Sequence, residues 1–414
     1  MKMVASTDIK FYVHTNNNAP QLQNAYGSMI NVLDACLIDG IQIGVISSLT
    51  ASGNTVTATF GAAHNLMQCQ VIKITGAAQP EFNGEHRILT VPNSNEVTFE
   101  LAAVPSVPIA TGAISASLPP LGWEKPFSST NEAGGGKAAY RSTNLLLPSR
   151  PFLRVVDELD PAYTATYAKY AKVGIVENMT DIDAMLGVQA PFDALNPNKN
   201  WVGTGSGTSA INGWAKWYYA RSRENTTDGA YDHATALNGD RSYLIIGNSD
   251  VFYVLNGHTS ADINNTLYSF GALESEDSAF FLGTTLYYGT ASNSGRPAQF
   301  TSFSSSNVST ACMVRKKTGE SYAMQSAKGF GLGVIESTIS TGASNYVAVE
   351  SALASDVFCV DSLNAYRGRL PIIKWLYNHR PYINHHVFYE NDHAYKAINL
   401  FTATGAGQML CKLW

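Results

Sequence analysis

Residues 45–91, VISSLTASGNTVTATFGAAHNLMQCQVIKITGAAQPEFNGEHRILTV, alternate apolar and polar residues almost throughout. Gly, Asn and Pro interrupt the alternation, in segments such as ASGN, GAAHN and FNGE. A period of two predicts strands that bury one face, and breaks of this composition predict turns. Through residue 118 the pattern predicts six strands: Val45–Thr50, Thr55–Phe60, Gln70–Thr75, His86–Val91, Val97–Leu101 and Ala113–Leu118. Short strands at intervals of roughly ten residues are typical of a small barrel.

The residues before this module predict other elements. DIKFYVH predicts a strand over Ile9–His14. A helix is predicted next, with Asn18 as its N-cap, Pro20 near its first turn and Gly40 at its C-cap. Its apolar stripe recurs at steps of three and four: Leu22, Tyr26, Met29, Leu33 and Cys36.

The module therefore enters and leaves a larger domain, whose sequence resumes at GWEKPF. We expect an N-terminal strand and helix in residues 1–41, an inserted small β-barrel in 42–118, and a β-rich main domain in 119–414. A further division near 195–210 stays open. The fold class expected is mainly β: a β-sandwich or jelly-roll-like main domain with one N-terminal helix and the inserted barrel.

Most of the main domain is predicted as strands. PFLRVVDEL (151–159) and AKVGIVENM (171–179) predict a strand pair, and SYLIIGNSDVFYVLNGH (242–258) predicts a hairpin that turns at GNSD. MTDIDAMLG predicts a short helical turn capped by Thr180. Further strands are expected in or near 214–223, 278–290, Ala311–Arg315 and Gly333–Ser337, with a final pair near His386–Tyr389 and Met409–Leu413. Residues 294–310 are the most loop-like stretch.

The composition excludes several classes of protein. Charged residues make up only 14%, and the net charge of −5 gives no general attraction to nucleic acid or anionic lipid. The five cysteines are scattered without CxxC spacing, which favours a reduced chain made in a cytosol. The N-terminus lacks the apolar core of a signal peptide, and no run reaches the ~18 apolar residues of a membrane helix. Low charge with 21 Tyr suits a subunit of a large assembly.

The sequence contains no convincing motif for catalysis or metal binding. His379, His385, His386 and His393 cluster near the C-terminus with Glu390 and Asp392, but His385 and His386 are adjacent and would point to opposite faces of a strand. The glycine clusters GTGSGT (203–208) and GFGLGV (329–334) are not followed by a helical pattern, as a phosphate cradle requires. The carboxylate pairs Asp157/Glu158 and Asp181/Asp183 suit caps and loops. We therefore predict no catalytic residue, no metal ligand and no cofactor.

Aromatic residues concentrate in WAKWYYAR, where Trp214, Trp217, Tyr218 and Tyr219 suit a core or a subunit interface more than sugar stacking. The glycosylation sequons at Asn178, Asn225, Asn264 and Asn307 carry no meaning without secretion.

Several islands of the sequence resemble the virion structural proteins of tailed bacteriophages. They are TDIKFYVHTNNNAPQLQNAYGSMINVLDACLIDG, the β-module itself, GWEKPFSSTNEA, RPFLRVVDE, VGIVENMTDIDAMLG and YRGRLPIIKWLYNHRPYINHHVF. The last island departs from the group's pattern at Ile372 and Tyr377. Together the islands touch about half of the chain and carry no enzymatic motif, and residues 195–350 carry little of the resemblance.

The resemblance implies a non-enzymatic structural component of a tailed bacteriophage virion, in the tail or baseplate, that acts through homo-oligomeric and heteromeric assembly contacts. The partners expected are copies of the chain and other virion proteins, and a host surface glycan or receptor stays open as a further partner. No nucleic acid and no membrane insertion are expected, and the location expected is the virion, for a chain made in the host bacterial cytoplasm. Two alternatives stay open: a capsid decoration or vertex protein, and a tail protein that binds or depolymerises host glycans.

Overall fold

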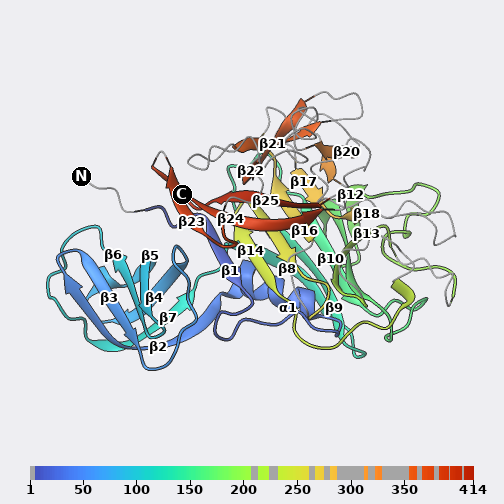
Figure 1. Cartoon of the computed structure of the whole chain (residues 1–414). Helices are drawn as coiled ribbons and strands as arrows, with labels where there is room; N and C mark the ends of the chain where they lie inside the picture. Colours follow the sequence, from blue (N-terminus) through green and yellow to red (C-terminus); the bar gives the residue numbers. More distant parts are fainter. Residues whose placement is uncertain are drawn as a thin grey trace.

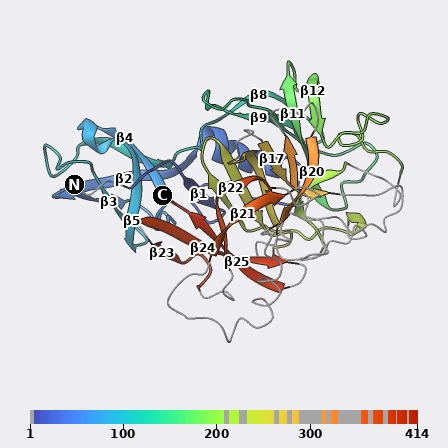
Figure 2. The same cartoon turned by 90° about the horizontal axis from the view of Figure 1, so that it is seen from above.

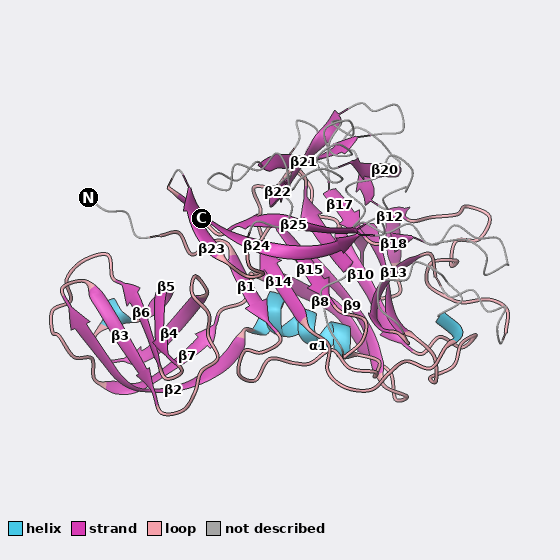
Figure 3. Ribbon diagram, viewed as in Figure 1, coloured by secondary structure: helices cyan, strands magenta, loops and turns pink. Residues whose placement is uncertain are grey.

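The computed structural model describes residues 5–206, 213–222, 232–260, 266–274, 280–286, 312–315, 322–328, 354–360, 366–376, 382–390, 392–402 and 405–414. Over these residues the fold is mostly β, with one short α-helix and a closed barrel, which confirms the expected fold class (Figures 1 and 3). Within the described residues, no helix has the length and apolar character needed to cross a membrane.

The barrel consists of six antiparallel strands in the order β2-β3-β6-β5-β4-β7. They are β2 (Ile41–Ser52), β3 (Thr55–Phe60), β4 (Val71–Ala77), β5 (Gly84–Asn93), β6 (Glu96–Glu100) and β7 (Gly112–Leu118), with a 3-10 turn at Pro80–Phe82. Alternate residues fill the barrel: Val56, Ala58 and Phe60 are buried on β3, while the threonines between them are half-buried. Its first and last strands pair at Ile41 and Leu118, so the barrel leaves and rejoins the rest of the chain at one place.

The N-terminal segment differs from its prediction at the start of the helix. After β1 (Lys10–Val13) the chain stays irregular, and α1 covers only Ser28–Asp34 before a π-helical turn over Ala35–Asp39. Asn18 is not the N-cap: its backbone is left-handed, and its side chain donates to the Gln42 carbonyl at 2.8 Å. Leu22 instead forms a bridge with Arg241, so tertiary pairing overrides the helical periodicity there. The predicted C-cap at Gly40 is confirmed, with a φ of 79°.

A seven-stranded sheet forms one layer of the body, in the order β18-β13-β11-β10-β9-β8 with β12 paired to β11. Its strands are β8 (Trp123–Thr130), β9 (Gly135–Ser142), β10 (Phe152–Glu158), β11 (Lys169–Met179), β12 (Met185–Ala190), β13 (Ala215–Ala220) and β18 (Thr285–Leu286). The predicted pair β10–β11 is confirmed, with Val155 opposite Val173. The helical turn predicted at Thr180 is wrong, because residues 180–184 form the turn of the β11–β12 hairpin.

The second sheet has twelve strands, in the order β1-β14-β15-β16-β17-β19-β20-β21-β22-β25-β24-β23. The strands after β1 are β14 (Tyr243–Gly247), β15 (Val251–Asn256), β16 (Thr266–Ala272), β17 (Phe280–Gly283), β19 (Cys312–Arg315), β20 (Tyr322–Lys328), β21 (Ala354–Val360), β22 (Tyr366–Leu376), β23 (Val387–Glu390), β24 (His393–Thr402) and β25 (Gly405–Lys412). The predicted hairpin at GNSD is confirmed as β14–β15. The predicted final pair is wrong in its pairing, because β24 lies between β23 and β25. The predictions for 294–310 and 333–337 fall outside the described residues.

The two sheets pack face to face around Trp217, whose ring lies 6.2 Å from Phe252 and donates from Nε1 to the Gly283 carbonyl at 3.0 Å. The other face of β14–β16 packs against β22, β24 and β25, and one apolar cluster joins Leu244, Ile373 and Ile398. The barrel stands at one end of this layered body in both views (Figures 1 and 2). Its apolar core is nevertheless continuous with the core between the two body sheets.

Candidate functional site

The two carboxylate pairs considered from the sequence have structural roles in the fold. Asp157 and Glu158 are neighbours on β10 and point to opposite sides of the sheet. Asp157 is fully buried, and its carboxylate accepts hydrogen bonds from the backbone of Met29 and Ile30 at 3.0 and 3.3 Å and from the Tyr219 hydroxyl at 2.5 Å. Burial raises the pKa of Asp157 to about 6, although these donors oppose the shift. Asp157 thus anchors the start of α1 from a neighbouring strand.

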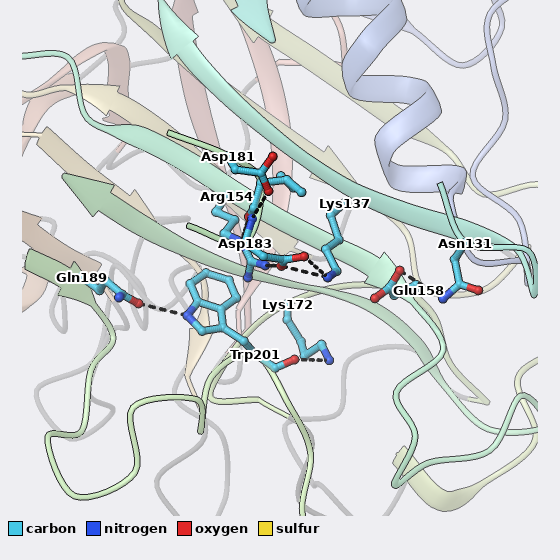
Figure 4. A network of polar contacts seen from close by, with 10 residues as sticks. Asn131, Lys137, Arg154, Glu158, Lys172, Asp181, Asp183, Gln189 and Trp201 are labelled. Atoms are coloured by element: carbon cyan, nitrogen blue, oxygen red, sulfur yellow. Dashed lines mark hydrogen bonds and ion pairs between the residues drawn. The ribbon is translucent and has the colours of Figure 1, made fainter. Parts of the chain in front are cut away.

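Asp181 and Asp183 lie in the turn between β11 and β12, where Figure 4 shows the contacts of Asp183. Asp183 accepts hydrogen bonds from Arg154 at 2.5 Å and from Lys137 at 2.7 Å. Burial alone would raise the pKa of Asp183, but these two cations hold it below its usual value. The Arg154 guanidinium also stacks over the Trp201 ring at 4.5 Å. This network fastens the segment after β12 to the outer face of the seven-stranded sheet.

The C-terminal histidines do not converge. His385 and His386 lie in a turn before β23, not on a strand, and His379 is outside the described residues. His386 stacks on Tyr382 at 5.6 Å, while burial lowers the pKa of His385 to about 4. Within the part of the chain that the structure describes, no three His, Cys, Asp or Glu side chains gather as metal ligands.

In the described residues, the glycine clusters form no phosphate-binding loop. Residues 203–206 form irregular chain after Trp201, and residues 207 and 208 lie outside the described ranges, as does the whole of GFGLGV. Where the chain is described again it forms β13, a strand. The sequons at Asn225, Asn264 and Asn307 are likewise outside the described residues.

The aromatic strand β13 serves as core. Trp217, Tyr218 and Tyr219 are fully buried, and Trp214 is half-buried under the Lys199 ammonium at 4.2 Å. Tyr219 faces the interior between the sheets, and Tyr218 lies on the outer face. The three buried rings therefore offer no exposed stacking surface to a sugar.

A buried cluster of charges around Asp232 was not predicted from the sequence. Asp232 Oδ1 accepts from Arg221 at 2.9 Å, and Oδ2 accepts from Tyr218 at 2.6 Å and Lys216 at 3.3 Å. The Lys216 ammonium also lies 4.2 Å from the centre of the Tyr170 ring. Burial would raise the pKa of Asp232, but the two cations hold it below its usual value. Burial lowers the pKa of Lys216, against the pull of Asp232.

A second buried pair lies on the same face of the sheet. Lys172 donates to Asp160 and to the Trp201 carbonyl, both at 2.6 Å, and Asp160 also accepts from the Gly203 backbone at 2.7 Å. Both side chains are almost fully buried. These groups satisfy the backbone of a covering segment, so their role in this fold is to fix that segment on the sheet.

The barrel is joined to the body through Arg87 on β5, which was also missed. Arg87 is 2% exposed, and its guanidinium donates to four carbonyls. Nη1 donates to Cys69 at 2.8 Å, and Nη2 donates to Ile9 at 3.0 Å and Leu413 at 3.2 Å. Nε donates to Ser6 at 2.9 Å, and the group lies 5.0 Å above the Trp414 ring. One residue thus connects the barrel with both terminal segments of the described chain. Burial lowers its pKa to about 10, so it stays charged at neutral pH.

A buried amide pair extends this junction. Gln70 Nε2 donates to Asn16 Oδ1 at 2.9 Å and to the Phe11 carbonyl at 3.1 Å, and Asn16 Nδ2 donates back to Gln70 Oε1 at 3.1 Å. Met67 and Cys69, on the same barrel loop, pack into the apolar cluster of the twelve-stranded sheet. Apolar packing and satisfied polar contacts together fix the barrel in one orientation.

The barrel–body junction is the best candidate functional feature in the described residues. His86, Arg87 and Ile88 are three successive buried residues on β5, which breaks the period of two. A run of successive buried residues indicates a strand that is covered on both faces. The sequence does not show which segment covers the second face. The junction positions a module; it carries no arrangement of nucleophile, base and oxyanion donors.

No model of a known protein family matches the chain, and no curated protein matches it.

Proposed function

We propose that the chain is a structural component of a tailed bacteriophage virion, placed in the tail or baseplate, where it acts by assembly contacts with copies of itself and with other virion proteins. One observation carries this proposal beyond the sequence resemblance: a closed accessory barrel is held rigidly at one end of a layered β body by Arg87. A rigid accessory module can present a surface to a neighbouring subunit without a large loss of entropy on binding.

The charges of the body support the same function. Its buried ion pairs join covering segments to the sheet, and each carboxylate of these pairs is already occupied by cations, hydroxyls or backbone donors. Such groups stabilise a shape and are not poised for proton transfer to a substrate. A subunit of a permanent particle needs a defined shape and broad contact surfaces.

Immunogold labelling of purified virions tests the location. The antibody is raised against the barrel, and the expected result is gold at the tail end of the particle. Gold over the capsid shell would favour a decoration or vertex protein, and virions without the chain in their protein composition would reject the proposal. The copy number from quantitative mass spectrometry separates the first two outcomes, since a tail ring holds copies in threes or sixes.

A further inference from the structure

The ion pair of Lys172 with Asp160 combines a short contact with nearly complete burial. Its Nζ and Oδ2 atoms lie 2.6 Å apart, and each side chain is 4% exposed. Lys125 lies equally close to a carboxylate, but both side chains of that pair are at least 20% exposed. Lys216 and Asp232 are buried, but their contact is longer, at 3.3 Å. At Lys172, an amine and a carboxyl carbon are therefore held side by side and shielded from solvent.

Other cations surround Lys172 on this face of the sheet. Lys216 on β13 lies directly opposite Lys172 on β11, and like charges in that position destabilise a sheet. Burial lowers the pKa of Lys172, and the charge of Arg154 lowers it further, against the pull of Asp160 and Glu158. A buried ammonium is thus disfavoured here relative to a neutral nitrogen. An amide between Lys172 and Asp160 would remove both buried charges.

Backbone groups hold both reacting side chains in place. Asp160 Oδ1 accepts a hydrogen bond from the Ala162 backbone at 2.9 Å, and Oδ2 accepts one from the Gly203 backbone at 2.7 Å. Fixed N–H donors of this kind stabilise the negative charge that develops on oxygen when a nucleophile adds to a carbonyl carbon. The Trp201 carbonyl accepts from Lys172 Nζ at 2.6 Å, which fixes the nitrogen beside the carboxyl group (Figure 4).

We propose that Lys172 Nζ and Asp160 Cγ join in an isopeptide bond within the folded chain. One proton first moves from the ammonium to Oδ2, which leaves a neutral amine beside a carboxylic acid. The amine lone pair forms the N–C bond, and the π electrons of the C–Oδ1 bond move onto Oδ1. When this adduct collapses, those electrons re-form the carbonyl and the C–Oδ2 bond breaks. Oδ2 takes a second proton from the nitrogen and leaves as water. An ammonium and a carboxylate thus become an amide and one water molecule, with no oxidation and no other reactant.

Glu158 is placed to carry the second proton from the nitrogen to the leaving oxygen. Val156 on β10 faces Lys172 across the ladder, and Glu158 follows two residues later on the same face. Diagonal cross-strand neighbours lie within reach of long side chains. Asn131 donates to Glu158 Oε2 at 3.1 Å, which leaves Oε1 for proton transfer.

Intact mass spectrometry of the purified full chain under denaturing conditions tests the bond. The wild type should be lighter than its sequence mass by one water molecule. Trypsin should fail to cleave after Lys172, and the peptide that contains Lys172 should carry the Asp160 peptide as a branch. Lys199 is the control in the same chain, since its contact with Asp193 is longer, at 3.4 Å, and more exposed, so cleavage after Lys199 should be normal. K172R keeps a cation but lacks the amine, and it should show the full sequence mass.

A folded wild type that keeps its full sequence mass after several days at neutral pH, with cleavage after Lys172, would overturn the proposal. A mass loss that maps to a succinimide at Asp39–Gly40 would overturn it too, since that product also lacks one water but leaves Lys172 cleavable. The wild-type measurement decides the question even if K172R fails to fold.

E158Q tests the proton carrier. Its linked fraction should grow about a hundredfold more slowly than that of the wild type. An equal rate would overturn the role given to Glu158. The bond is measured on the purified chain and needs no virion, so it stands or fails independently of the proposed function.

Discussion

The barrel and the outer face of the seven-stranded sheet bury their residues by different means. In the barrel, alternate apolar side chains such as Val56, Phe99 and Ile114 fill a closed interior. On the sheet face, Lys172 is buried with Asp160 of the loop between β10 and β11, and Lys216 is buried with Asp232 of the segment between β13 and β14. The barrel is stabilised by apolar burial, which does not depend on any one pair of residues. The sheet face depends on matched pairs, in which each charge needs its own partner.

This difference predicts that the two regions respond differently to mutation. Loss of one apolar group in the barrel leaves a small cavity. Loss of one charge on the sheet face leaves another charge buried without compensation, which costs more.

The largest effect is expected for D232A. The substitution leaves Lys216 and Arg221 buried without their shared carboxylate, and should lower the free energy of unfolding by about 3–5 kcal/mol. Urea unfolding at neutral pH followed by tryptophan fluorescence measures the change. The control is E124Q, whose carboxylate pairs with Arg141 and Arg150 at the surface and whose loss should cost about 1 kcal/mol or less. Equal losses in both variants would contradict the role given to Asp232.

The barrel could be predicted from the sequence because its information is local. All six of its strands were located by alternation and by Gly and Asn breaks, since each strand pairs with others in the same module of the chain. The charge pairs on the sheet face could not be predicted, because Asp232 and Lys216 meet only after the sheet has formed. The start of α1 was misplaced for a related reason: Leu22 fits a helical stripe but pairs with Arg241, which is more than two hundred residues away. The role of Arg87 could not be predicted because its partners are backbone carbonyls, and the pattern of side chains does not show which carbonyls accept its hydrogen bonds.

The second effect concerns the junction between the two regions. R87M keeps the aliphatic stem and removes the guanidinium, which leaves the carbonyls of Cys69, Ile9 and Leu413 without this donor. The free energy of unfolding should fall by about 3 kcal/mol, because buried acceptors lose their partner. Differential scanning calorimetry should show the barrel melting separately from the body.

K73M is the control for the junction. Lys73 is exposed on the neighbouring strand β4, so its replacement should keep the wild-type melting profile. If R87M also kept that profile, Arg87 would not couple the barrel to the body.

The third effect is a pH dependence of the free energy of unfolding, which is caused by Asp157. Its pKa is raised from 3.8 to about 6 in the fold, so the folded chain binds the proton more tightly than the unfolded chain does. The stability contributed by the protonated form is complete below about pH 4 and is lost as the pH rises through about 6. Compared with D157N, the wild type should therefore gain about 2 kcal/mol between pH 7.5 and pH 4.

The comparison with D157N is necessary because buried histidines act in the opposite direction. Burial lowers the pKa of His258 to about 3 and that of His385 to about 4, so their contribution to stability is lost as the pH falls below about 6.5. The free energy of unfolding of the wild type should fall in acid, but it should fall less than that of D157N. Urea unfolding of both proteins at pH 4, 5, 6 and 7.5 measures the difference, and a difference that does not change with pH would reject the assignment to Asp157.

The smallest effect tests whether the barrel and the body unfold as one unit. Ile74 in the barrel and Ile245 in β14 are both fully buried, and both belong to the one apolar cluster that spans the two regions. I74V and I245V each remove one methylene group, and each should lower the free energy of unfolding by about 1 kcal/mol. Because the cluster is continuous and Arg87 joins the regions, both variants should shift the same calorimetric transition. In the R87M background the two should separate: I74V should shift only the barrel transition, and I245V only that of the body. If the variants shift different transitions while Arg87 is present, the barrel is an independent unit, and the continuous core does not couple it to the body.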